Sequence, residues 1–96
     1  MKSVIIMKAI KGTVTGRVQG VGFRYFTIDA ADESGLSGWV RNLPDGNVEF
    51  FAQGNEKEFQ NFTNKLKIGP PLSRVDKLLI NTIEPDMELR GFEARF

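Results

Sequence analysis

The chain has 96 residues, enough for one modest hydrophobic core, which predicts a single domain over residues 1–96. It contains neither cysteine nor histidine, so disulfides, thiolate nucleophiles and metals bound through sulfur or imidazole are excluded. The net charge is only +1, but the first 28 residues hold five of the 13 lysines and arginines and none of the 12 acids. A local positive field on a nearly neutral molecule favours a small anionic ligand over a nucleic acid.

The N-terminal segment begins with an apolar run at residues 4–7, which is too short for a signal sequence or a membrane span and ends at Lys8. A cytoplasmic protein with no membrane partner is therefore expected. Residues 7–18 mix β-branched and polar types, with apolar side chains at even spacing, and predict a strand with one buried face. Gly12, inside this strand, indicates a bulge or a close backbone approach.

A glycine-rich run without a carboxylate follows the strand, at residues 16–24. Its glycines let successive N–H groups converge, and such backbone nests bind anions. The sequence then turns helical, so the loop would deliver its ligand to the unpaired N–H groups of a helix N-terminus. Arg24 falls in the first turn, where its guanidinium can form a fork over phosphate oxygens. The run predicts a phosphate cradle, although a plain glycine-rich turn with solvated arginines has the same pattern.

Two helices are predicted from apolar residues at helical spacing. The first follows the glycine-rich run and ends at Gly35. The second follows Asn55, an N-cap with Glu58 as its capping-box partner, and ends at the Gly-Pro-Pro run of residues 69–71. The expected buried positions are Phe23, Phe26, Thr27, Ala30, Ala31 and Ser34 in the first helix, and Phe59, Phe62 and Leu66 in the second.

Four further strands complete the predicted fold. Residues 36–43 and 47–53 form a hairpin whose turn contains a proline and a glycine, residues that suit a tight reversal. Residues 75–83 form the next strand, and alternating apolar residues near the C-terminus form a short last one. The order β-α-β-β-α-β with an added strand predicts the α+β class, with two helices on one face of a mainly antiparallel sheet in the ferredoxin-like arrangement.

A second polar cluster lies at the end of the second predicted strand, where Arg41 precedes Asn42. Strand alternation sends the two side chains to opposite faces of the sheet, so only one can point into a site beside the cradle. Arg41 is interpreted as a solvated charge at the strand end.

The residue types present in and near the predicted cradle limit the reactions that the protein can catalyse. Covalent catalysis lacks a nucleophile, and metal catalysis lacks carboxylates near the cradle. What remains is electrostatic stabilisation by Arg24 and backbone N–H groups, with a water positioned by the amide of Asn42. That suffices if the leaving group needs no proton, as for a carboxylate, whose conjugate acid has a pKa of roughly 4. A mixed carboxylic–phosphoric anhydride and water therefore fit these residues.

The sequence closely resembles the acylphosphatase family, in order and spacing along nearly the whole chain. The matching blocks are residues 16–24 (GRVQGVGFR), residues 35–42 (GLSGWVRN), Asp45-Gly46-x-Val48-Glu49, Gly69-Pro70-Pro71-x-x-x-Val75 and Gly91-Phe92-Glu93.

The resemblance implies the ferredoxin-like fold and the hydrolysis of acyl phosphates to carboxylate and orthophosphate, with no metal, cofactor or covalent intermediate. Arg24 matches the family's phosphoryl-binding arginine, and Asn42 its asparagine that orients the hydrolytic water. Orthophosphate is then both product and inhibitor, and we expect a monomer that binds no nucleic acid. The backbone of the family's cradle loop matches Arg17, Val18, Gln19, Gly20, Val21 and Gly22. One departure is Ser34, where the family usually has leucine, and it puts local stability in doubt rather than chemistry.

Two alternatives belong to other functional classes. An RNA-recognition module has the same element order, but its aromatic motif must lie on a central strand, and here Phe23 and Phe26 follow a helical period. A regulatory domain of the same fold that binds a small anion without turnover is the second alternative.

Trp39 is expected in the core rather than beside a ligand. Phe50 and Phe51 cannot share one sheet face, so one of them is expected exposed or under a loop.

Overall fold

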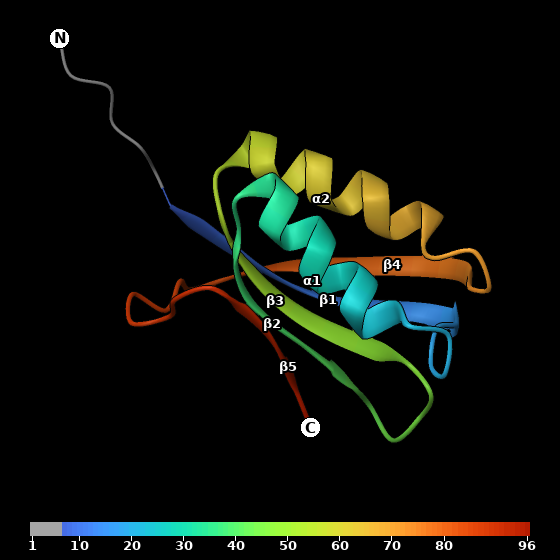
Figure 1. Cartoon of the computed structure of the whole chain (residues 1–96). Helices are drawn as coiled ribbons and strands as arrows, with labels where there is room; N and C mark the ends of the chain where they lie inside the picture. Colours follow the sequence, from blue (N-terminus) through green and yellow to red (C-terminus); the bar gives the residue numbers. More distant parts are fainter. Residues whose placement is uncertain (1–6) are drawn as a thin grey trace, which may run out of the picture.

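A five-stranded sheet carries two helices on one face in the computed structural model, which describes residues 7–96 (Figure 1). The strand order is β4-β1-β3-β2-β5, and every neighbouring pair is antiparallel except β2 and β5, which are parallel. The predicted ferredoxin-like α+β arrangement with a short final strand is confirmed. The elements in chain order are β1 (Lys8–Arg17), α1 (Phe23–Ser34), β2 (Ser37–Asn42), β3 (Val48–Gly54), α2 (Glu56–Ile68), β4 (Arg74–Ile83) and β5 (Phe92–Arg95).

The prediction that the N-terminal apolar run at residues 4–7 is neither a signal sequence nor a membrane span is tested only in part, because residues 4–6 lie outside the described residues. Within residues 7–96, neither helix is long and apolar enough to cross a membrane.

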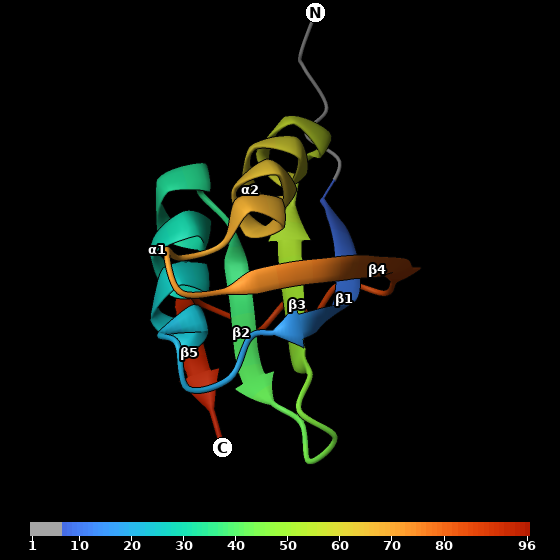
Figure 2. The ribbon, with the colours of Figure 1, turned by 90° about the vertical axis from the view of Figure 1, so that its right-hand side faces the viewer.

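The core lies between the sheet and the two helices, which lie side by side in both views (Figures 1 and 2). The ring of Phe50 on β3 meets the edge of Phe62 on α2, with centroids 5.2 Å apart. Gly12 on β1 makes room for Phe50, since a Cβ at this position would lie 2.3 Å from the ring's Cζ. A side chain rather than another backbone therefore comes close at Gly12, and the register shift typical of a bulge lies further along β1, between Thr15 and Gly16.

The face of the sheet that turns away from the helices holds a second, smaller cluster. Phe51 is buried there at 7% exposure and stacks on Trp39, with centroids 6.1 Å apart. The guanidinium carbons of Arg41 and Arg95 each lie 5.2 Å from the centre of the Trp39 ring. The expectation that Phe50 or Phe51 would be exposed or under a loop was wrong, because Trp39 covers Phe51. Trp39 is half-buried in this cluster rather than in the core under the helices.

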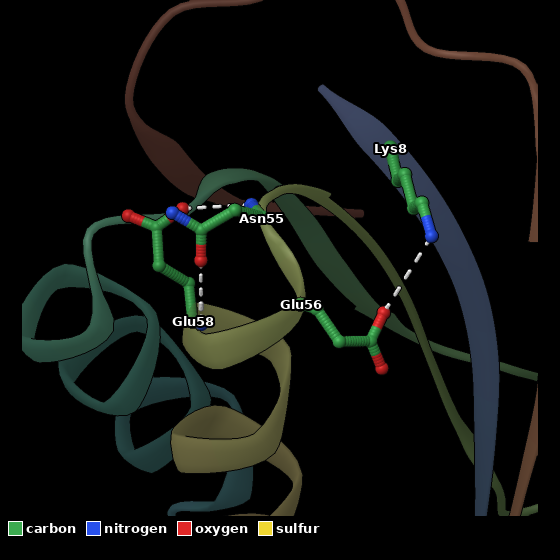
Figure 3. Close-up of polar contacts among 4 residues, drawn as sticks. All are labelled: Lys8, Asn55, Glu56 and Glu58. Carbon is green, nitrogen blue, oxygen red and sulfur yellow. Dashed lines mark hydrogen bonds and ion pairs between the residues drawn. The ribbon is translucent and has the colours of Figure 1, made fainter. Parts of the chain in front are cut away.

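The two helices begin differently, although both predicted termini are close to the observed ones. At α2, Asn55 Oδ1 accepts from the N–H of Glu58 at 2.9 Å, and Glu58 Oε1 accepts from the N–H of Asn55 at 2.8 Å (Figure 3). The predicted capping box is therefore confirmed. At α1, Gly22 occupies the N-cap position with φ 79°, and in the described part of the chain no side chain caps this end.

The buried stripe of α1 is as predicted, except that Phe26 is only partly buried. Thr27 satisfies its hydroxyl by donating to the carbonyl of Phe23 at 2.8 Å. Ser34 is 7% exposed, and its Oγ finds no hydrogen-bond partner among the described residues. The local weakness expected at Ser34 thus has a physical form, a buried hydroxyl without a partner.

Candidate active site

The loop between β1 and α1 lies at the same end of the sheet as the β2–β3 hairpin (Figures 1 and 2). Gly20 and Gly22 both have positive φ, 73° and 79°, and a Cβ at either position would meet nothing within 4 Å. Backbone conformation, rather than lack of space, therefore explains these two glycines. Their conformation turns the chain so that α1 begins directly after the loop.

The side chain of Gln19 ties this loop to the hairpin. Its Nε2 donates to the carbonyl oxygens of Leu43 and Asn47, both at 2.8 Å. Leu43 directly follows Asn42, so these bonds fix the position of the loop relative to the end of β2. Only the backbone of Gln19 was predicted to belong to the site, and its side chain proves to be structural.

A small hollow opens between the start of α1 and the end of β2, with a volume of about 150 Å³. We call it the α1–β2 hollow. Arg24 and Asn42, from two different elements, are both half-buried at its wall. The lining residues are Gly20, Gly22, Phe23, Arg24, Tyr25 and Asn42.

Electrostatically the α1–β2 hollow is positive. No acid is among its lining residues, and none of the ion pairs found within residues 7–96 involves Arg24. The uncapped N-terminus of α1 contributes the positive end of the helix dipole and the unpaired N–H groups of its first turn. By contrast, α2 uses Asn55 and Glu58 to satisfy its own N-terminus (Figure 3). These charges favour an anion over a cation as the ligand of the hollow.

Arg24 has one specific neighbour outside the hollow. Its guanidinium carbon lies 4.9 Å from the centre of the Phe96 ring, a cation–π distance. No ion pair found within residues 7–96 provides a carboxylate that would compete for its N–H groups.

The other predicted cradle residues contribute their backbone rather than side chains to the loop. Val18 is buried in the core, Val21 packs against it, and Arg17 is exposed at the end of β1. Arg41 lies on the opposite face from Asn42, as strand alternation predicted. It is not simply solvated, because its Nη2 pairs with Glu49 Oε1 at 2.7 Å.

Two residues in or beside this site were not predicted from the sequence. Tyr25 lines the hollow, and Phe96 lies over Arg24. Tyr25 directly follows Arg24 and lies off the buried stripe of α1. These two facts could have predicted an exposed aromatic residue beside the site. The contact of Phe96 depends on the tertiary fold and left no such local signal.

A larger hollow, of about 410 Å³, lies between α2 and the strands β1 and β4. Its floor is apolar, and Lys8 at its rim is 3.9 Å from Glu56 (Figure 3). Because its lysine has a carboxylate partner, this hollow suits an anion less well than the smaller one.

Elsewhere on the surface, the hydrogen bond from Arg74 lowers the pKa of Asp76. Within residues 7–96, no group of three or more acidic residues is arranged to hold a metal ion.

These features define a class: a small ferredoxin-like α/β protein with a positive hollow where a glycine-rich loop, a helix N-terminus and the end of a strand meet. Phe23 and Phe26 lie in α1, so the aromatic motif that an RNA-recognition module requires is not on a strand. The sequence model of the acylphosphatase family matches residues 10–94. The chain belongs to the acylphosphatase family.

Individual relatives agree with the family model. The acylphosphatase of Archaeoglobus fulgidus is 51% identical over 90 residues, which cover 94% of this chain and 100% of the relative. That of Trichormus variabilis is 49% identical over 82 residues, 85% of this chain and 80% of the relative. The crystal structure of the Bacillus subtilis acylphosphatase superposes with a TM-score of 0.88 at 37% identity, covering 95% of this chain and 100% of that one. The chain is therefore a hydrolase of the acylphosphatase type, which acts on acyl phosphates.

Proposed function

We propose that this chain hydrolyses acyl phosphates in the α1–β2 hollow, by direct attack of water on phosphorus without a covalent intermediate. The observation that carries the proposal is that Arg24 and Asn42 line one hollow at a helix N-terminus that no side chain caps in the described structure. A guanidinium, free N–H groups and a neutral amide are sufficient for a reaction that needs charge stabilisation and positioning alone.

The phosphoryl group would be bound by the backbone N–H groups of residues 17–22 and by the guanidinium of Arg24. Both kinds of donor form charge-assisted hydrogen bonds with phosphate oxygens. They would strengthen in the transition state, where negative charge develops on the equatorial oxygens. The absence of acids from the lining of the hollow supports this role, since a carboxylate there would repel the substrate.

The amide of Asn42 would hold the attacking water, its carbonyl oxygen accepting one of the water's hydrogens. The water oxygen forms a bond to phosphorus while the bond from phosphorus to the acyl oxygen breaks, and the bonding pair leaves with the carboxylate. The products are a carboxylate, orthophosphate and a proton released to solvent. No general acid is required, because a carboxylate is a stable leaving group at neutral pH.

The proposal extends to how the chain works as a whole. Residues 1–96 would act as one domain, in the cytoplasm. The chain would act as a monomer, since both proposed catalytic side chains come from a single copy. The substrate would be a small acyl phosphate, with orthophosphate as product and inhibitor. Neither a nucleic acid, a membrane, a metal nor a cofactor would take part.

The experiment is an assay of the full chain with acetyl phosphate and with benzoyl phosphate, in the presence of a metal chelator. Hydrolysis that the chelator leaves unchanged and orthophosphate inhibits competitively is the expected result. Binding of orthophosphate without turnover of either substrate would favour an anion-sensing domain and overturn the proposal.

A further inference from the structure

The α1–β2 hollow is small, with a volume of about 150 Å³, and it opens to solvent. In the proposed reaction the phosphoryl group and its attacking water lie beside Arg24 and Asn42 at the wall of the hollow. The acyl group is joined to the phosphoryl group on the side opposite the attacking water, so it would extend from there along the rim.

The rim carries an aromatic side chain that the chemistry described above does not use. Tyr25 lines the hollow and is 75% exposed. Its neighbours on α1, Phe23 and Thr27, are buried, so Tyr25 lies beyond the edge of the buried stripe. None of the side-chain hydrogen bonds found in residues 7–96 involves its hydroxyl. Tyr25 thus lies at the mouth of the site, with its ring open to solvent.

We propose that Tyr25 determines acyl-group specificity by packing against aromatic or bulky apolar acyl groups. The inference rests on the proposed function, because it requires the phosphoryl group to be anchored in the α1–β2 hollow. An exposed ring beside an anchored ligand gains apolar contact when the ligand also carries a ring, and aromatic pairs prefer offset or tilted contacts. An acetyl group is too small to cover the same surface.

The kinetic signature follows from where this contact is made. The acyl group keeps its place while the bond to phosphorus breaks, so Tyr25 would contact substrate and transition state equally. Such uniform binding lowers KM and leaves kcat unchanged. Tyr25 would therefore favour aromatic acyl phosphates through KM alone.

The test compares the Tyr25→Ala and Tyr25→Phe variants with the unmodified chain on benzoyl phosphate and acetyl phosphate. For Tyr25→Ala we expect KM for benzoyl phosphate to rise about 3- to 10-fold, with kcat unchanged and both constants for acetyl phosphate within about twofold. Tyr25→Phe keeps the ring and should behave like the unmodified chain. Binding of phenylphosphonate, which cannot be hydrolysed, should weaken in Tyr25→Ala while binding of methylphosphonate does not.

Phe96→Ala is a matched control, since Phe96 is also exposed but contacts Arg24 rather than lining the hollow. Its effect should be the same on both substrates. If Tyr25→Ala changed both substrates equally, or neither, while turnover persisted, the inference would be overturned and the proposed function would stand. If the unmodified chain hydrolysed neither substrate, the proposed function itself would fail.

Discussion

Arg24 and Asn42 line one hollow, although the first lies in the opening turn of α1 and the second is the last residue of β2. They are 18 positions apart along the chain, in two elements that pack against each other. The loop between β1 and α1 helps to fix their relative position, because Gln19 holds it against the turn of the β2–β3 hairpin, which begins after Asn42. The site is therefore a product of the tertiary fold rather than of one motif.

Gln19 should matter through position rather than through direct contact with substrate. We expect Gln19→Ala to destabilise the fold by about 1–3 kcal/mol, since it removes two hydrogen bonds to the carbonyls of Leu43 and Asn47, although each carbonyl keeps one backbone donor. It should also lower kcat, because the loop is no longer fixed relative to Asn42. Thermal unfolding and steady-state kinetics measure the two effects. Unchanged stability and kinetics would show that the two hydrogen bonds do not hold the loop.

Orthophosphate should stabilise the fold against heat. At a phosphate concentration ten times its Kd, binding to the folded state alone contributes about 1.4 kcal/mol. For a domain of this size we expect a rise in Tm of roughly 6–11 °C. Sulfate and chloride at matched ionic strength are the controls. An equal rise with chloride would mean that general salt effects, rather than a site, produce the shift.

Removing the hydroxyl of Ser34 should stabilise the protein. We expect Ser34→Ala to raise the free energy of unfolding by about 1 kcal/mol, since it removes a buried oxygen that has no partner in the described structure. The matched control is Thr27→Val on the same helix, which deletes a buried hydroxyl that does have a partner, the carbonyl of Phe23. That variant should lose stability. Opposite signs are the expected result of chemical denaturation, and equal losses would refute the explanation.

Turnover should not depend on the ionisation of an active-site side chain near neutral pH. The lining of the α1–β2 hollow contains no carboxylate, and the chain has neither histidine nor cysteine, so the side chains that most often act as general acid or base are missing from it. We therefore expect kcat to stay constant between about pH 6 and 9 once substrate is saturating. A bell-shaped kcat profile in this range would indicate a general acid or base that the mechanism lacks.

Much of the fold was predictable because its signals are local. The capping box of Asn55 and Glu58 and the glycine that ends α1 are each specified within a few residues of sequence. Strand alternation likewise predicted that Arg41 and Asn42 would lie on opposite faces.

Features that depend on distant partners were missed. Phe51 is buried because Trp39 on the neighbouring strand stacks on it, and that pairing is set by sheet register. The Gln19 side chain finds its two carbonyls in a hairpin far along the chain. Phe96 reaches Arg24 only through the placement of β5 beside β2. No periodicity in the sequence encodes such contacts.

The central claim is that Arg24 binds the phosphoryl group while Asn42 orients the water. It is tested most directly by measuring kcat/KM and the inhibition constant of orthophosphate in Arg24→Ala and Asn42→Ala, after circular dichroism has shown both to be folded. Arg24→Ala should lose phosphate inhibition and at least about 100-fold in kcat/KM. Asn42→Ala should lose kcat to a similar extent while its phosphate inhibition constant stays within about threefold of the original. Equal loss of phosphate affinity in the two variants, or full turnover in Asn42→Ala, would contradict this division of roles.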